Sequence, residues 1–589
     1  MLSSPVECMG ILLEGARQCP GVMLLILSTS WISKERSRGD PNLFSLFVHK
    51  AVTFDTAGRT FLDVFDPPRK VTYFVNFFTD GCTDGQRKDG EPIERDLDCP
   101  TSDSLNLVQI IDDKVLTRIL MAEAGMQYPE TLAFTYNVQH RYPKSEFDDI
   151  VIIKLEKING VQEQVQCQVR KYLNRVKTRV QQVVVKPSGI MYHGSMGVTF
   201  HFTGDEEHVV SAILGLLESM PENNGVLVEE FYAPYSGDQT ESTLDITDLS
   251  FRLRSNVCRG LNDTPITTTL VCGVGNKNEP INGDNTQPQS FETTLHQMGL
   301  SAHETRLREE VISTSENVLR RIIEFEKGLT IQEKGGVGAQ TDIIGIDFVI
   351  GQKNGVISPI GIEVNSHDCT INCQLFEFIN PRLSGSSLRP LVETMVSRSQ
   401  EFVLQGRTIV VLGSGGTSKR FIWPIAKSYG VQVVLIDEEG CDVNAKEMCS
   451  MFIPYDFSNH VDDIDHADAI SEILQSHAVK ADGCCTFWED CVPLTARLCS
   501  VLGLMGTGVE GAINAKQKSR TQKILMKRTG DIPHFPRTYL YAGKTVQIKT
   551  RVDIPKHMPK FRMPCMLKLE YGSSAVGCQT CQEYRGMRK

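Results

Sequence analysis

Two polar side chains near residue 365 have the types and the spacing of ligands for a hard metal ion. Glu363 and Asn365 stand two positions apart in an otherwise apolar segment, so on a β-strand both would point to one face. A carboxylate and an amide oxygen placed in that way suit Mg²⁺ or Mn²⁺, whose remaining ligands would be phosphate oxygens and water. Asp347 belongs to the preceding apolar run, and the turn at 353–355 would bring it alongside as a third candidate ligand.

A lysine on an apolar strand, followed by a glycine-rich loop, is a second element with chemical potential. Lys186 follows three valines, and burying its ammonium group without an anionic partner would be costly. The backbone N–H groups of the loop could close over the β- and γ-phosphates of a nucleotide. The candidate phosphate-binding residues of this segment are Lys186, Ser188, Gly194, Ser195 and Gly197.

Two further segments carry charged side chains at the ends or on one face of predicted strands. Glu229 and Glu230 end a short apolar strand, where they could accept hydrogen bonds from adenine and ribose. Arg252 and Arg254 share one face of a later strand, where they could clamp a carboxylate or a transferring phosphoryl group. We take the two arginines as the catalytic candidates.

Each of these patterns also has an ordinary structural explanation. The lysine could reach water beside a hairpin turn, the acids could end an edge strand, and the arginines could form an exposed basic face. The metal-ligand trio could be the wet face of a hairpin. The order along the chain carries more weight than any one element: lysine strand, glycine loop, acidic strand end, arginine strand, aspartate strand and Glu-x-Asn strand.

Composition narrows the classes of protein that fit. The chain has 589 residues, enough for about three to five domains. Its net charge of −11 argues against a general nucleic-acid binder, and no apolar run reaches the ~20 residues that cross a bilayer. Eighteen cysteines lack a framework of short spacings, and Cys578 and Cys581 form a lone CxxC, which disfavours zinc. We expect a cytoplasmic protein with reduced thiols and no nucleic-acid or membrane partner.

Several segments recur in the same order in the second half of the chain. The sequence ILMAEAG at 119–125 recurs as ILMKRTG at 524–530, and both copies follow lysines and precede a proline. The lysine strand recurs with Lys568, followed by a glycine loop at 572–577. Several recurrences in one order favour a tandem duplication.

The ordered elements of residues 111–400 resemble those of an ATP-grasp domain, and the segment before them resembles the domain that precedes such modules. The resemblance implies ATP with Mg²⁺ or Mn²⁺ as cofactors. It also implies an α/β fold, with α+β ATP-grasp parts, built from tandem Rossmann-like and ATP-grasp modules. The corresponding domains are 1–110, an α/β domain; 111–400, a first ATP-grasp domain; 406–511, a second Rossmann-like domain; and 512–589, the start of a second ATP-grasp domain.

The same resemblance assigns nucleotide contacts to individual residues. Lys186 and the backbone at 194–197 would contact phosphates, and Lys114, at a helix start, fits the family's other nucleotide lysine. Glu229 or Glu230 would hold adenine or ribose. Lys568 would be the equivalent nucleotide lysine of the second copy.

The resemblance also assigns the metal ligands, with two departures from the usual pattern. Asp347, Glu363 and Asn365 match the ligand positions, although the family more often has a glutamate where Asp347 stands. An arginine often follows the Glu-x-Asn motif closely in the family, whereas Ser366 and His367 follow here.

A turn in the second half has some features of a dinucleotide-binding fingerprint. Three of the four residues at 413–416 are glycines, and Asp437 closes the next predicted strand. Ser418 stands where the third glycine of the fingerprint belongs, so NAD is a poor fit. Elsewhere, residues 301–326 show helical periodicity with many charges.

Over its whole length the chain resembles dipeptide ligases of the ATP-grasp family that consist of two such halves. This resemblance implies an ATP-dependent ligase that joins β-alanine to L-histidine through an acyl phosphate and releases ADP and phosphate. The sequence leaves the subunit count open, and a homo-oligomer is compatible with it. A ligase for other amino acids is one alternative.

A second alternative arises from the incomplete second copy. After Lys568 and its glycine loop, the sequence has no acidic strand end, arginine strand or Glu-x-Asn strand. We therefore expect a C-terminally truncated form. On this alternative the chain is a catalytically inactive piece that binds nucleotide or another subunit.

Overall fold

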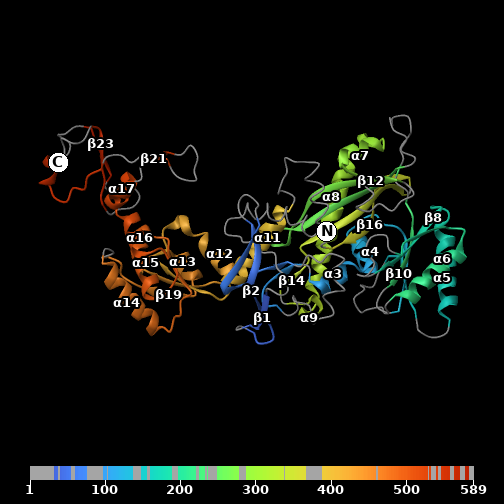
Figure 1. The fold of residues 1–589 in the computed structure, drawn as a ribbon, viewed down its shortest axis with the longest axis horizontal. Helices are drawn as coiled ribbons and strands as arrows, with labels where there is room; N and C mark the ends of the chain where they lie inside the picture. Colours follow the sequence, from blue (N-terminus) through green and yellow to red (C-terminus); the bar gives the residue numbers. More distant parts are fainter. Residues whose placement is uncertain are drawn as a thin grey trace. The chain divides into compact units, whose positions relative to one another are not determined.

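The chain divides into two units, Met1–Phe402 and Val403–Lys589, which are described separately below. Figure 1 shows the helices and strands of both units in sequence colours. The computed structural model describes residues 32–37, 40–54, 60–75, 97–102, 104–136, 147–155, 160–188, 197–220, 225–232, 235, 249–276, 287–336, 338–353, 355–366, 388–458, 462–527, 530–531, 539–540, 545–557, 563–570 and 578–582.

The first unit begins with an antiparallel sheet in the order β1-β2-β3. Only residues 55–59 separate β2 from β3, too few for the crossover that parallel strands need. Strands β1, β2 and β3 therefore form an antiparallel meander, and the α/β domain predicted for residues 1–110 stays a prediction, because residues 1–31 lie outside the described part of the chain. Two-residue strands β4 and β5 pair in parallel, and β5 pairs in parallel with β14. The bounds are β1 Ile32–Arg36, β2 Phe44–Phe54, β3 Thr60–Lys70, β4 Phe74–Val75, β5 Thr101–Ser102 and β14 Ala339–Gln340.

A five-stranded sheet in the order β7-β6-β10-β8-β9 carries the lysine strand. The strand β8 (Gln182–Ser188) lies inside this sheet, and Val183 and Val185 are fully buried, as a valine-rich run predicts. Helices α5 and α6 pack against each other and against strands of this sheet (Figure 1). The other bounds are β6 Thr131–Thr135, β7 Ile150–Lys154, β9 Thr199–Phe202, β10 Gly225–Glu230, α5 Val161–Val176 and α6 Glu206–Ser219.

A second five-stranded sheet, in the order β13-β12-β11-β15-β16, is antiparallel throughout. The predicted hairpin is confirmed, because β15 and β16 pair from Lys353 and Val356 onward. Helix α8 (Glu304–Lys327) packs on this sheet and confirms the periodicity at 301–326. The bounds are β11 Leu249–Arg259, β12 Pro265–Asn276, β13 Gln287–Ser290, β15 Ile343–Lys353, β16 Val356–Asn365, α3 Leu105–Ile111, α4 Lys114–Glu123, α7 Phe291–Gln297, α9 Ile331–Lys334 and α11 Arg389–Leu404.

A β-bulge interrupts the pairing of β15 with β16 beside the predicted metal ligands. Phe348 pairs with Gly361 and Asp347 pairs with Glu363, so Ile362 is an extra residue without a partner in the register. Bulges bend a strand and re-aim its side chains, and they are frequent next to active sites. The bulge therefore fixes the direction of Glu363.

Gly361→Ala is expected to destabilise this unit by about 1–3 kcal/mol, because it overfills a packed core. An added Cβ would meet the Sδ atom of Met126 at 2.4 Å and the Cε atom of Met121 at 3.5 Å. Urea unfolding measures the effect. The matched control is Gly215→Ala in α6, where nothing lies within 4 Å, and it should stabilise the unit by about 0.5–1 kcal/mol. Equal effects of the two variants would contradict the close approach at Gly361.

The second unit contains a parallel sheet in the order β19-β18-β17-β20. The backbone N–H of Ser414 donates to Oδ2 of Asp437 at 2.7 Å, so the glycine turn binds the acid that a dinucleotide ribose would need. Two short hairpins, β21–β22 and β23–β24, follow. The bounds are β17 Thr408–Leu412, β18 Gln432–Asp437, β19 Met451–Pro454, β20 Gly483–Thr486, β21 Gly530–Asp531, β22 Tyr539–Leu540, β23 Cys565–Leu567, β24 Gln579–Cys581, α12 Ile422–Ser428, α13 Val443–Met448, α14 Asp463–Ser476, α15 Val492–Val501, α16 Val509–Lys516, α17 Lys518–Lys527 and α18 Asp553–His557.

Over the ranges given above, no helix is both long and apolar enough to span a membrane.

Candidate functional site

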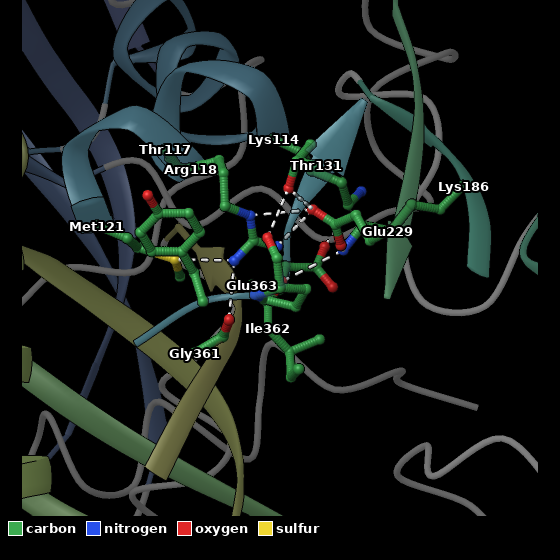
Figure 2. Close-up of polar contacts among 12 residues, drawn as sticks. Lys114, Thr117, Arg118, Met121, Thr131, Lys186, Glu229, Gly361, Ile362 and Glu363 are labelled. Atoms are coloured by element: carbon green, nitrogen blue, oxygen red, sulfur yellow. Dashed lines mark hydrogen bonds and ion pairs between the residues drawn. The ribbon is translucent and has the colours of Figure 1, made fainter. Parts of the chain in front are cut away.

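A buried arginine, Arg118 of α4, lies at the centre of the polar network drawn in Figure 2. Its Nε and Nη2 atoms donate to Oε1 of Glu229 at 2.9 and 2.7 Å. Its Nη1 atom donates to the carbonyl of Gly361, and Nη2 to that of Ile362, both at 2.8 Å. Since Glu229 belongs to β10 and the two carbonyls to β16, one side chain joins the two five-stranded sheets.

The predicted nucleotide lysine, Lys186, is part of the same network. Its Nζ atom lies 2.6 Å from Oε2 of Glu229 and donates to the carbonyl of Ile362 at 3.2 Å. The hydroxyl of Thr131 adds a fourth donor to Glu229, at 3.0 Å from Oε1. Glu229 thus has four donors from the protein, and its predicted contact with adenine or ribose stays a prediction.

Burial and charge act in opposite directions on this pair. Burial alone would raise the pKa of Glu229, but Arg118 and Lys186 outweigh it and hold that pKa below its usual range. Burial lowers the pKa of Lys186, and the attraction of Glu229 opposes this only in part. Glu229 therefore stays ionised, and the ammonium group of Lys186 is poorly solvated.

Lys114 and Ser188 meet at the N-terminus of α4. The Nζ atom of Lys114 lies 3.1 Å from Oε1 of Glu363, so the second predicted nucleotide lysine contacts a predicted metal ligand. The backbone N–H of Lys114 donates to the Ser188 hydroxyl at 2.9 Å, and that hydroxyl donates to Asp113 at 3.3 Å. Ser188, predicted to bind phosphate, is thus engaged in anchoring the start of α4 to the end of β8.

The predicted catalytic arginines surround Asp347. Arg254 binds both carboxylate oxygens, with Nε at 2.6 Å and Nη2 at 2.7 Å, and Arg252 Nη1 lies 3.7 Å away. The side-chain nitrogen of Asn365 donates to Asp347 at 3.3 Å. Burial would raise the pKa of Asp347, but the two arginines keep it below its usual range. The structure therefore brings these four predicted residues together.

Glu230 takes part in a different group at the end of β10. Its carboxylate accepts from the Tyr232 hydroxyl at 2.8 Å and from the backbone N–H of Glu130 at 3.0 Å, and it pairs with Arg179 at 3.0 Å. Arg179 also bonds the carboxylate of Glu130. Glu230 therefore contacts Tyr232, Glu130 and Arg179 in this structure, and its predicted role toward adenine or ribose stays a prediction.

Three of the remaining predicted positions belong to the glycine loops. Gly194 and Ser195 lie outside the described residues. Gly197 is exposed and has a φ of +70°, a left-handed conformation that favours glycine. Lys568 is exposed directly after β23 and belongs to the other unit.

Arg118 and Thr131 were not identified from the sequence. Arg118 is an isolated charge in an apolar helical stretch, four residues after Lys114, and residues at that spacing share a helix face. That spacing was an available signal for Arg118. Thr131 opens an apolar strand and carries no comparable signal.

The donor set on β15 and β16 fits a hard cation. Glu363 and Asn365 supply oxygens of the kind that Mg²⁺ prefers, and Glu363 keeps 26% of its side chain exposed. Asp347 lies opposite Glu363, but any metal would share its oxygens with Arg254. Among the residues with described positions, no three His, Cys, Asp or Glu side chains cluster as a metal site, so the amide of Asn365 is needed to complete the set.

Comparisons with known proteins identify the family of the chain. The family model of the ATP-grasp N-terminal domain matches residues 425–506. Carnosine synthase 1 of Homo sapiens is 33% identical over 572 residues, which are 95% of this chain and 69% of that protein. Carnosine synthase 1 of Gallus gallus is 30% identical over 589 residues, 98% of this chain and 62% of that protein. A solved L-amino acid ligase from Bacillus licheniformis is 18% identical, with a TM-score of 0.24, over 31% of this chain and 41% of that one.

The match to carnosine synthase 1 of Homo sapiens covers 95% of this chain and 69% of that protein. The chain therefore belongs to the carnosine synthase family of ATP-grasp carboxylate–amine ligases.

Proposed function

We propose that this ligase joins β-alanine to L-histidine. The γ-phosphoryl group of ATP passes to the carboxylate of β-alanine, which gives an acyl phosphate and ADP. The α-amine of histidine then attacks the acyl carbon, its proton is lost, and phosphate leaves as the amide bond forms. The observation that carries this proposal is the convergence of Lys114, Lys186 and Glu363 between the two sheets, in a chain related to carnosine synthase 1.

Lys186 and Lys114 are the proposed phosphate ligands. In the structure each ammonium group pairs with a carboxylate, Glu229 or Glu363. Phosphate oxygens would take over part of that role, and because both lysines are largely buried their attraction for phosphate is weakly screened. Gly194 and Ser195, which lie outside the described residues, stay predicted phosphate contacts.

Glu363, Asn365 and Asp347 are the proposed holders of Mg²⁺ or Mn²⁺. A bound divalent ion would neutralise charge that develops on the transferring phosphoryl group. The side chain of Arg252 is 29% exposed. It is the proposed clamp for the β-alanine carboxylate or for the phosphoryl group. Arg254 would orient Asp347 through its two-point contact.

The first experiment measures ADP release from Mg²⁺-ATP by the purified chain with β-alanine and histidine, together with detection of the dipeptide. Turnover that requires both amino acids would support the proposal. Turnover only with other pairs would retain the ligase and change its substrates. Nucleotide binding without turnover would favour a nucleotide-binding piece, and reactions that lack one amino acid are the controls.

Glu363→Gln is expected to remove most of the Mg²⁺-dependent part of ADP affinity, because the amide cannot supply the negative charge that a hard cation prefers. Titration of a fluorescent ADP analogue with Mg²⁺ and with EDTA measures that part directly. Glu309→Gln, at an exposed position of α8, is the matched control. Equal Mg²⁺ dependence in wild type and Glu363→Gln would return Glu363 to the role of a partner for Lys114.

A further inference from the structure

We propose that Arg118 is a positioning residue of the ligase: it braces β16 against β10 and thereby sets the separation of Glu363 and Lys186. The inference rests on the proposed function for the roles of those two residues. Arg118 itself is 2% exposed, and Figure 2 shows its side chain directed from α4 toward Glu229 and the strand that carries Glu363. It would act on the reaction only through its neighbours.

The brace engages β16 at its irregular point. Ile362 is the extra residue of the bulge, and its carbonyl accepts from Arg118 at 2.8 Å and from Lys186 at 3.2 Å. A bulge locally disrupts the ladder between strands, so hydrogen bonds from outside the sheet gain influence over the conformation there. The next residue along the strand is Glu363, so the carbonyl that Arg118 holds adjoins a proposed metal ligand.

Close packing brings the strand within reach of the arginine. The backbone N–H of Gly361 donates to the carbonyl of Gln127 at 2.8 Å, and Met126 lies where a Cβ of residue 361 would stand. The missing side chain thus lets β16 approach the segment that follows α4. The side chain of Arg118 thereby reaches two consecutive carbonyls of β16, those of Gly361 and Ile362.

The chemistry of the side chain explains why this position holds an arginine. Nε, Nη1 and Nη2 are all used: the planar fork spans the Glu229 carboxylate on one side and the two carbonyls on the other. A lysine would keep the charge but has a single nitrogen and no fixed fork. Arg118→Lys therefore separates geometry from charge.

A simpler role would be neutralisation of the buried Glu229 carboxylate. The double variant Arg118→Met/Glu229→Gln tests it, because the double variant removes both charges while Lys186 and β16 remain. Because Lys186 also pairs with Glu229, Glu229→Gln alone, measured in parallel, is the reference. If neutralisation were the whole role, exchange at β16 in the double variant would match that in Glu229→Gln. The brace predicts faster exchange in the double variant, since the bonds from Arg118 to Gly361 and Ile362 are missing only there.

Hydrogen exchange of peptides that cover β16 is the first measurement, in wild type, Arg118→Lys, Arg118→Met and the double variant. We expect faster exchange at residues 361–364 in all three variants. Arg170→Met is the matched control. Arg170, on α5, pairs with Glu206 of α6 at an exposed site, so its replacement should leave hydrogen exchange at β16 unchanged. Unchanged exchange in Arg118→Met, or exchange in the double variant equal to that in Glu229→Gln, would overturn the brace.

The second measurement is the ratio of ADP affinities with Mg²⁺ and with EDTA. Residues that orient metal ligands typically change metal affinity by 10–100-fold, so Arg118→Lys should reduce this ratio by about tenfold. A merely stabilising residue would lower the melting temperature and leave the ratio intact, which would overturn the positioning role. A wild-type chain that binds no nucleotide would instead overturn the proposed function, and exchange at β16 would still decide for or against the brace.

Discussion

Glu229→Gln is expected to lower the free energy of unfolding of the Met1–Phe402 unit by about 3–5 kcal/mol, the usual cost of removing one partner from a buried ion pair. Glutamine keeps the volume, so no cavity adds to the effect. The charges of Arg118 and Lys186 would lose their buried counter-charge, because both pair with this carboxylate. Denaturant unfolding of the purified chain, followed by the transition of this unit, measures the loss.

Glu206→Gln provides the contrast within the same unit. Glu206 also pairs with an arginine, Arg170, but that arginine is 59% exposed, so solvent screens the interaction. We expect little change in stability from Glu206→Gln. A comparable loss of unfolding free energy in both variants would mean that the buried ion pairs of Glu229 stabilise the unit no more than the exposed pair of Glu206 does.

The pH dependence of stability provides an independent check on Glu229. The pKa of Glu229 lies below its usual range in the folded chain because Arg118 and Lys186 outweigh the effect of burial, and the unfolded value is about 4.3. The folded state therefore resists protonation, so the stabilisation is complete above about pH 4.3 and is lost as pH falls through the lower, folded value. The stability difference between wild type and Glu229→Gln should narrow below about pH 4.3. A difference that stays constant down to pH 3.5 would contradict the paired carboxylate.

Lys186→Met is expected to weaken ADP binding by about 10–150-fold, the equivalent of 1.5–3 kcal/mol for a hydrogen bond from a charged donor. Its stability should fall less than that of Glu229→Gln, because Glu229 keeps its bonds to Arg118 and Thr131. Methionine keeps an apolar side chain of similar length at this position of β8. Titration with a fluorescent ADP analogue measures the affinity, and thermal unfolding checks the fold.

Lys171→Met is the matched control for this variant, since Lys171 is exposed on α5. It should bind ADP as wild type does. If Lys186→Met also bound ADP normally, the lysine would serve only as the counter-ion of Glu229, and the phosphate site would have to lie elsewhere.

Local patterns were sufficient to predict part of this molecule. The valine run before Lys186 predicted a buried strand, and alternation with a short turn predicted the hairpin that places Glu363 opposite Asp347; both predictions are confirmed. These features depend on residues close in sequence. The α/β class is likewise confirmed by the ATP-grasp N-terminal domain match at residues 425–506.

Features that depend on distant partners could not be predicted in this way. Arg118 forms hydrogen bonds with Glu229 and Gly361, which lie 111 and 243 residues away in the sequence. The residues around position 118 carry no pattern that predicts either partner. For the same reason, the ion pairs of Glu229 with Lys186 and of Glu230 with Arg179 could not be predicted from two acids at a strand end, and the predicted contacts with adenine or ribose stay a prediction. The bulge at Ile362 was also missed, because an extra residue in a strand changes register without a signature in composition.

The close pairing of Lys186 with Glu229 has a consequence for which anions the site admits. An ammonium group 2.6 Å from a buried carboxylate already has a strong partner, so a small anion that offers it a single contact gains little by approaching it. Inorganic phosphate and other small metabolite anions should therefore leave the site empty even at millimolar levels. A polyphosphate bound to a divalent ion offers several contacts at once. Only such a ligand would compensate for the partial separation of Lys186 from Glu229. Selectivity for the energy-rich nucleotide would thus be present before any substrate amino acid binds.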